Sequence, residues 1–272
     1  MVVNGRGVPQ SPPPLGSAAV VEVWFVGVDD VVAAERCLPL LAPEDRARLG
    51  RLAPPLRHRH VCAHAAARLL ACAAIPGESP ARVLTRTVDG RLALAASAAP
   101  PDGRFDISLA HAGDAAAIAF SRCGAVGVDI EVVGALGESE ERRLARYALA
   151  EPEFAQWCEA AAELRARLLT RAWTRKEAVL KALGLGLAGD VRSVATRLDP
   201  DVEAAAGTDR TQAVVRIDGF PGLAGAPSNW TLRDLPDEPG LIGSLAVRAP
   251  NVTVRYRRSG IFGLLERMDP GS

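Results

Sequence analysis

The sharpest chemical feature of the sequence is the segment Gly127-Val128-Asp129-Ile130-Glu131. It is expected to be a β-strand, on which Asp129 and Glu131 share one face while their apolar neighbours face the core. Two carboxylates about 6.5–7 Å apart repel each other, and magnesium relieves that repulsion in a cleft because it prefers hard carboxylate oxygens. The alternative is a strand whose acidic face is solvated by water.

A second feature is the segment Trp173-Thr174-Arg175-Lys176-Glu177-Ala178-Val179-Leu180-Lys181. Glu177 and Lys181 lie four positions apart on one helical face, which is also the spacing of an ordinary surface ion pair. Trp173 extends the same stripe and indicates that the stripe packs against something. The pair is therefore expected at a margin between core and cleft.

Lysine is rare in this chain, and its two lysines, Lys176 and Lys181, lie five positions apart. Arginine supplies the other basic side chains. Because lysine can change its protonation state and arginine effectively cannot, this clustering indicates a place where a compact ammonium is required. Coincidence is the alternative.

The histidines form a second candidate group. His58, His60 and His64 surround Cys62 in a segment that reads as a helix. The spacing resembles a metal site, but the flanking arginines would repel a cation, so a basic helix face is favoured over a zinc site. His111 stands apart and reads as an ordinary histidine at a strand end.

The segment Gly184-Leu185-Gly186-Leu187-Ala188-Gly189 matches the GxGxxG pattern of dinucleotide-binding loops. Such a loop must follow a strand and precede a helix, so that the pyrophosphate meets the helix N-terminus. Here it follows a predicted helix and leads towards a strand. We therefore predict a glycine turn that ends the helix.

Composition excludes several classes of protein. The 272 residues carry 32 basic and 32 acidic side chains, and this neutral balance argues against a general nucleic-acid binder. Five scattered cysteines without a CxxC pair indicate buried thiols in a reducing compartment. No apolar segment is long enough to span a membrane, and the N-terminus does not read as a signal peptide. A cytoplasmic protein is expected.

The elements that must position these residues alternate between strands and helices. Strands are predicted at 20–28, 83–88, 92–96, 105–109, 115–121, 126–132, 191–198, 212–217, 230–235 and 241–247. Helices are predicted from 43, over 56–74, and over 139–183 with a break near 151. This order predicts an α+β fold with two lobes of similar size. The expected division is a disordered head (1–18), an N-terminal lobe (19–122), a C-terminal lobe (123–256) and a tail (257–272).

Three motifs in order, Phe105–His111, Gly127–Glu131 and Trp173–Gly184, resemble those of the 4′-phosphopantetheinyl transferases, specifically the long, monomeric Sfp-type class. The resemblance covers residues 20–250. It implies two pseudo-symmetric α/β lobes with the active site in the cleft between them. It also implies transfer of 4′-phosphopantetheine from coenzyme A to a serine of an apo acyl or peptidyl carrier protein, which yields holo-carrier protein and adenosine 3′,5′-bisphosphate.

The resemblance also assigns roles to residues. Three carboxylates would hold magnesium or manganese: Asp129, Glu131 and Glu177. Glu177 would also take the proton of the carrier serine, and Lys181 would neutralise or protonate the departing bisphosphate. The remaining coenzyme phosphate contacts would be Arg48, Arg59, Arg91 and His111.

One departure from the family pattern concerns Ala110, where the family usually has serine before its histidine. The loss of a hydroxyl donor, worth about 0.5–1.5 kcal/mol, predicts weaker coenzyme A affinity. Carrier docking is expected on Leu183–Val194, and the pathway served, fatty-acid, polyketide or nonribosomal peptide, is left open. Two rival functions remain: a module that binds coenzyme A or a carrier without transfer, and a nicotinamide oxidoreductase that rests on the glycine segment alone.

Overall fold

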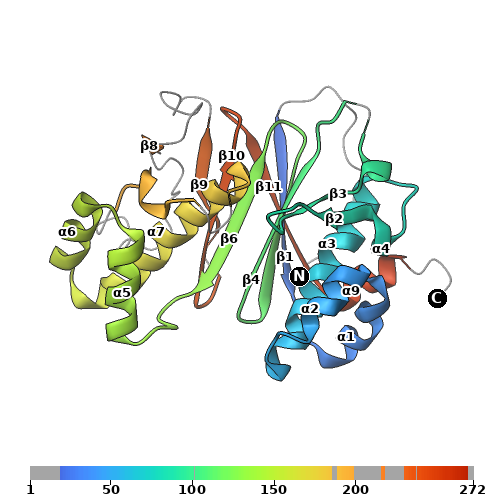
Figure 1. Cartoon of the computed structure of the whole chain (residues 1–272), viewed down its shortest axis with the longest axis horizontal. Helices are drawn as coiled ribbons and strands as arrows, with labels where there is room; N and C mark the ends of the chain where they lie inside the picture. Colours follow the sequence, from blue (N-terminus) through green and yellow to red (C-terminus); the bar gives the residue numbers. More distant parts are fainter. Residues whose placement is uncertain are drawn as a thin grey trace, which may run out of the picture.

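The computed structural model describes residues 19–100, 102–185, 189–198, 216–217, 230–236 and 238–268. Within them the chain has a mixed α+β fold, as the sequence predicts. Two β-sheets lie at the centre, and a group of helices covers the outer side of each (Figure 1). The expected head, residues 1–18, lies outside the described part of the chain.

The first sheet has the strand order β11-β1-β5-β4. Its strands are β1 (Val20–Gly27), β4 (Asp106–Ala112), β5 (Ala115–Ser121) and β11 (Thr253–Gly260). Pairing is antiparallel within β1-β5-β4 and parallel between β1 and β11. The helices of this half are α1 (Val31–Cys37), α2 (Pro43–Leu49), α3 (Pro54–Ala74), α4 (Pro80–Val83) and α9 (Ile261–Met268). A short hairpin of β2 (Leu84–Arg86) and β3 (Leu92–Leu94) turns at Gly90, as the sequence predicts.

The second sheet has the antiparallel order β6-β10-β9. Its strands are β6 (Val126–Val132), β9 (Thr231–Asp234) and β10 (Leu241–Val247). The predicted helical region forms α5 (Glu138–Ala148), α6 (Glu151–Glu159) and α7 (Ala162–Leu183). After α7 come a 3-10 turn (Val191–Ser193) and a small sheet of β7 (Val194–Ala195) and β8 (Arg216–Ile217). None of the described helices is both long and apolar enough to cross a membrane.

The two sheets pack face to face over an apolar core. Val128 and Ile130 of β6 point into this core, together with side chains of β1, β5 and β10. Because side chains alternate along a strand, Asp129 and Glu131 point to the opposite side of β6, where α7 lies. The hydrophobic alternation of this one strand therefore fixes the direction of both carboxylates.

Helix α7 lies unusually close to β6. A Cβ atom at Gly127 would lie 1.9 Å from the carbonyl oxygen of Ala178 and 2.6 Å from the amide nitrogen of Ala182. Only glycine permits this approach, since any side chain would overlap the helix backbone. The close contact brings Glu177 and Lys181 of α7 over the acidic face of β6.

Buried ion pairs hold α7 in this position. The guanidinium of Arg175 donates two hydrogen bonds, of 2.8 and 2.7 Å, to the Asp234 carboxylate of β9. The ammonium of Lys176, fully buried, lies 2.7 Å from the Glu153 carboxylate of α6 and donates to the Val194 carbonyl. Such pairs are costly to break, because removal of one partner leaves an unpaired buried charge. Lys176 therefore anchors the helix in the protein interior and does not face the acidic side of β6.

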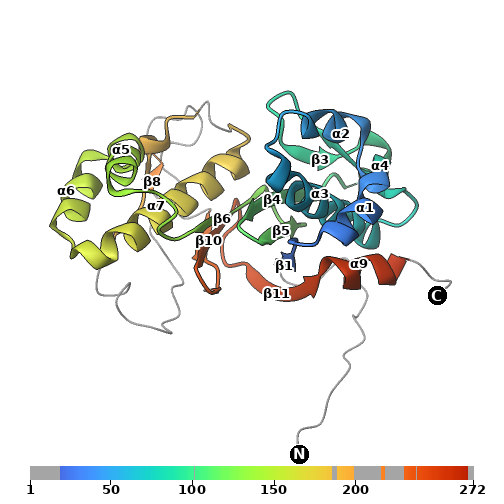
Figure 2. The ribbon, with the colours of Figure 1, turned by 90° about the horizontal axis from the view of Figure 1, so that it is seen from below.

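The C-terminal segment differs from the predicted division. Strand β11 crosses the expected boundary at residue 256 and pairs along the whole of β1, and α9 follows it against α3. Figure 2 shows β11 and α9 along one side of the first sheet and its helices. Residues 257–268 are therefore part of the N-terminal half and do not form a tail. The arginine-rich sequence of β11 concealed this edge strand, because its charged side chains remain largely exposed.

The glycine segment after α7 agrees with the prediction of a helix-ending turn. Gly184 has a left-handed conformation, with φ of 71°, and its amide donates back to the last helical turn. The described residues that follow lead to a 3-10 turn and a short strand, whereas a dinucleotide loop would open a helix. Residues 186–188 lie outside the described part of the chain.

We predict that Gly127→Ala destabilises the protein by about 2–4 kcal/mol, because its methyl group would overlap the backbone of α7. Denaturant unfolding measures the effect. Gly137→Ala is the matched control, since its added methyl meets no atom within 4 Å, and its effect should stay within about 0.5 kcal/mol. Equal unfolding midpoints for the two variants would show that the contact is unimportant.

Candidate active site

The structure brings four of the predicted site residues together. Asp129 and Glu131 face α7 from strand β6, and Glu177 and Lys181 face them from the helix. The Lys181 ammonium lies 2.7 Å from Oδ1 of Asp129 and donates a second hydrogen bond of 3.1 Å to the Val128 carbonyl. A lysine that is partly exposed and paired to a buried carboxylate is placed where a ligand can also reach it.

The three carboxylates share a poorly hydrated environment. Burial raises the pKa of Asp129, against the opposing effect of the Lys181 ammonium. Burial, followed by the nearby charge of Asp129, raises the pKa of Glu131 to about 7. The same two causes raise the pKa of Glu177. The carboxylates therefore lie close enough to repel one another, and a single ammonium does not neutralise them all.

Two observations fit this group to a magnesium ion. Oδ2 of Asp129 is buried and finds no hydrogen-bond partner among the described residues. Three carboxylates also form the hard oxygen donor set that magnesium prefers.

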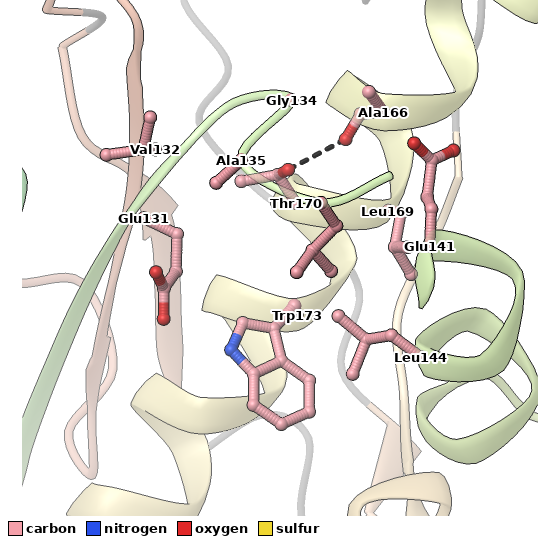
Figure 3. Close-up of a pocket in the computed structure, with 11 residues that line it drawn as sticks. Glu131, Val132, Gly134, Ala135, Glu141, Leu144, Ala166, Leu169, Thr170 and Trp173 are labelled. Carbon is pink, nitrogen blue, oxygen red and sulfur yellow. Dashed lines mark hydrogen bonds between the residues drawn. The ribbon is translucent and has the colours of Figure 1, made fainter. Parts of the chain in front are cut away.

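A cavity of about 240 Å³ opens beside this group, between β6, α5 and α7 (Figure 3). Glu131 lies at one side of it, and Leu144, Leu169 and Trp173 supply apolar walls. The Trp173 side chain faces the Glu131 carboxylate across the cavity and lowers the pKa of that group. The tryptophan that indicated a packed stripe on α7 therefore lines the cavity beside a carboxylate.

Two of the predicted phosphate contacts, Arg59 and Arg91, are already paired with carboxylates. Arg59 donates to Oδ1 of Asp29 at 2.9 Å. Arg91 donates to Oδ2 of Asp106 at 2.5 Å and to the Val126 carbonyl at 2.8 Å. The Asp106 carboxylate accepts the Val126 amide as well, so Arg91 and Asp106 link β4 to β6. A phosphate role for either arginine stays a prediction, and Arg91 also has a structural role.

The other predicted contacts lie nearer to the β2–β3 turn. The guanidinium of Arg48, an exposed residue at the end of α2, approaches Gly90. Arg86 was not predicted, yet it donates to the Gly90 carbonyl and to the Asp45 carboxylate, both at 2.6 Å. Nothing in the sequence distinguished Arg86 from the many other arginines of this chain.

The structure contradicts the prediction of a basic helix face at His60 and His64. His64 is buried, His60 is half-buried, and both rings turn towards His111 of β4. Only His58 behaves as expected, since it stays near the surface and contacts Asp29 at 2.6 Å. His111 is therefore one of three clustered imidazoles and not an isolated strand-end residue.

Ala110 lies on the other side of the same strand. Its side chain packs in the core between the two sheets, next to Ala117 of β5, whereas His111 faces α3. A serine here would place its hydroxyl in an apolar core. The expected effect of Ala110 on coenzyme affinity stays a prediction.

Comparison with known proteins relates part of this chain to a known family. Residues 125–222, less than half of the chain, match the family model of the 4′-phosphopantetheinyl transferase superfamily. It is also 34% identical over 87 residues to a Synechocystis sp. protein named "Putative 4'-phosphopantetheinyl transferase slr0495". That match covers 32% of this chain and 35% of the relative, so the chain spans about a third of the length of the curated relative.

The superfamily match contains the four clustered residues and leaves out the predicted phosphate contacts of the first half. Asp129, Glu131, Glu177 and Lys181 lie within residues 125–222. Arg48, Arg59, Arg91 and His111 lie before them. The similarity to the 4′-phosphopantetheinyl transferase superfamily therefore lies in the half of the molecule that holds the carboxylates.

We predict that Glu131 makes the metal-free protein less stable as pH rises. Its folded-state pKa of about 7 exceeds the ordinary value of 4.5, so the folded protein holds this proton more tightly than the unfolded chain. In EDTA, the free energy of unfolding should fall by up to about 2 kcal/mol between pH 5 and 7 because of this group. Glu131→Gln should flatten that part of the profile. An unchanged profile in the variant would contradict the raised pKa.

Proposed function

We propose that this protein transfers 4′-phosphopantetheine from coenzyme A to a serine of an apo carrier protein, as an Sfp-type, magnesium-dependent enzyme of the holo-[acyl-carrier-protein] synthase kind. The observation that carries the proposal is the grouping of Asp129, Glu131, Glu177 and Lys181 within the part of the chain that matches the superfamily. A monomer acting in the cytoplasm is part of the proposal.

The chemistry is a phosphoryl-type displacement. The serine oxygen attacks the phosphorus that carries the pantetheine arm and forms a new P–O bond. The bond from this phosphorus to the bridging oxygen of the pyrophosphate breaks, and adenosine 3′,5′-bisphosphate leaves with that oxygen. Such reactions ask a protein mainly for positioning and for stabilisation of negative charge.

Glu177 is assigned to take the proton of the serine hydroxyl, directly or through water. Its raised pKa supports this role, because a base works best when its pKa approaches the working pH. Lys181 is assigned to neutralise or protonate the leaving bisphosphate. Its contact with Asp129 holds the ammonium beside the carboxylates before any substrate binds.

Asp129, Glu131 and Glu177 would hold magnesium, or manganese, and the unpartnered Oδ2 of Asp129 supports this set. Bound there, the ion would supply positive charge for the pyrophosphate oxygens. In the first half, His111 and Arg48 would contact the coenzyme phosphates. Arg59 and Arg91 could do so only by sharing or exchanging their present carboxylate partners.

The proposed carrier belongs to the fatty-acid, polyketide or nonribosomal peptide class. Residues 183–194 are proposed as its docking segment, although 186–188 lie outside the described residues. A nicotinamide oxidoreductase is not supported, because the glycine pattern ends a helix.

We predict that Asp129→Asn lowers transfer by at least about 100-fold while the fold remains intact, because it removes a carboxylate charge from the metal set. Intact mass spectrometry of apo carrier proteins, incubated with coenzyme A and magnesium, measures the added phosphopantetheine. Glu44→Gln, an exposed carboxylate on α2, is the control and should keep wild-type activity.

EDTA should abolish the mass gain of the wild-type protein, and added magnesium should restore it. Full activity of Asp129→Asn would overturn the metal assignment. Binding of coenzyme A or carrier without any mass gain, over a panel of acyl and peptidyl carriers, would replace the enzyme by a non-catalytic binding module.

A further inference from the structure

Three imidazoles gather between helix α3 and strand β4. The ring centroids of His60 and His64 are 4.1 Å apart, and that of His111 lies 5.5 Å from His60 and 6.4 Å from His64. One ring nitrogen from each lies within 4.8 Å of the other two. Among the described residues, these three side chains form a group that could hold a metal ion.

The three imidazoles are in the neutral form, which can donate a ring-nitrogen electron pair to a metal ion. Burial, followed by the charge of His111, lowers the pKa of His60 to about 4. Burial also lowers the pKa of His64 and of His111, although His111 keeps part of its surface exposed. All three rings are therefore neutral at pH 7, the form that binds metal ions. Nε2 of His60 is buried and has no hydrogen-bond partner among the residues described.

The arginines near these histidines in sequence turn away from them. Arg57 donates to the Leu52 carbonyl, and Arg59 pairs with Asp29. Arg68 is buried against Asp45 at 2.6 Å. The charge of Arg68 still lowers the pKa of His64, but the Asp45 carboxylate that Arg68 binds offsets this charge.

Arg86 is in direct contact with the cluster, whereas Arg48 lowers the pKa of His60, and Lys181 that of His111, through their charge. Nη2 of Arg86 lies 3.4 Å from Nδ1 and 3.5 Å from Nε2 of His64, at the outer limit of a hydrogen bond. Asp45, 2.6 Å from Nε of Arg86, offsets this charge. The Arg86 contact with His64 is weak enough to be exchanged for a stronger ligand bond.

We propose that His60, His64 and His111 form a binding site for a zinc ion. Two histidines four residues apart on one helix, completed by a third from another element, make a recurrent zinc ligand set, and the fourth position would hold water. Nitrogen donors distinguish this site from the oxygen donors of Asp129, Glu131 and Glu177, which favour magnesium. The exposure of His111 provides access for the ion.

Occupation of this site would engage His111. If His111 contacts the coenzyme phosphates, zinc would compete with coenzyme A, and this consequence alone rests on the proposed function. Zinc binding itself does not. It is therefore tested in the absence of coenzyme A and carrier.

The test is titration of the full-length, tag-free protein with Co²⁺, a spectroscopic substitute for zinc, in excess magnesium to occupy the carboxylates. We expect one saturable visible absorption band per chain, which zinc abolishes by displacing Co²⁺. His60→Ala and His111→Asn should each weaken Co²⁺ binding at least about 10-fold. His111→Asn is included because His111 is exposed near the end of β4, so this variant is expected to fold even if His60→Ala does not. Circular dichroism checks both variants.

His58→Ala is the matched control, since it removes a histidine from the same helix whose ring contacts Asp29. It should bind Co²⁺ as the wild type does. The proposal is overturned by the absence of a saturable band, by unchanged binding in His60→Ala and His111→Asn, or by an equal loss in His58→Ala. None of these results depends on transferase activity, so the proposed function is tested separately.

Discussion

The backbone contact between α7 and β6 is the constraint on which the rest of the site depends. The Ala178 carbonyl occupies the space that a side chain at residue 127 would need. Because residue 127 is glycine, the helix lies directly on the strand, and side chains one turn apart on α7 reach those two apart on β6. A wider helix–strand distance would place Glu177 and Lys181 beyond the reach of Asp129.

The position of α7 is secured on the side away from the first sheet. Arg175 forms an ion pair with Asp234, and Lys176 forms one with Glu153, in sites from which water is largely excluded. These buried charges add specificity of placement, because each has one well-defined partner and no hydrated alternative. Glu177 and Lys181 therefore project from a helix whose position is secured, and the Lys181 side chain remains partly exposed.

The two halves meet through an apolar core and through polar contacts between β4 and β6, in which the Ser108 hydroxyl accepts the Val128 amide. The Asp106 carboxylate accepts both the Arg91 guanidinium and the Val126 amide, and so joins the hairpin, β4 and the first residue of β6. The contact with Asp106 therefore holds the beginning of β6, the strand that carries Asp129 and Glu131, against β4 of the first half. The histidine cluster of α3 and β4 lies on that first half, so its distance from the carboxylates depends on the same polar contacts.

The sequence by itself determined most of the helices and strands, and which nearby functional side chains share a face. Alternation predicted that Asp129 and Glu131 share a face, helical spacing predicted the same of Glu177 and Lys181, and the glycine turn after α7 followed from element order. Each of these depends on neighbours within a few residues. The motif order also pointed to the superfamily.

Only the tertiary structure decided how distant segments meet. It separated the two lysines, one buried against Glu153 and one beside Asp129, although both lie on one helix. It turned His60 and His64 inward to His111, and it returned β11 to pair with β1. The physical reason is common to all three. Which face of an element is buried depends on the surface it packs against, and that surface comes from residues far away in the chain.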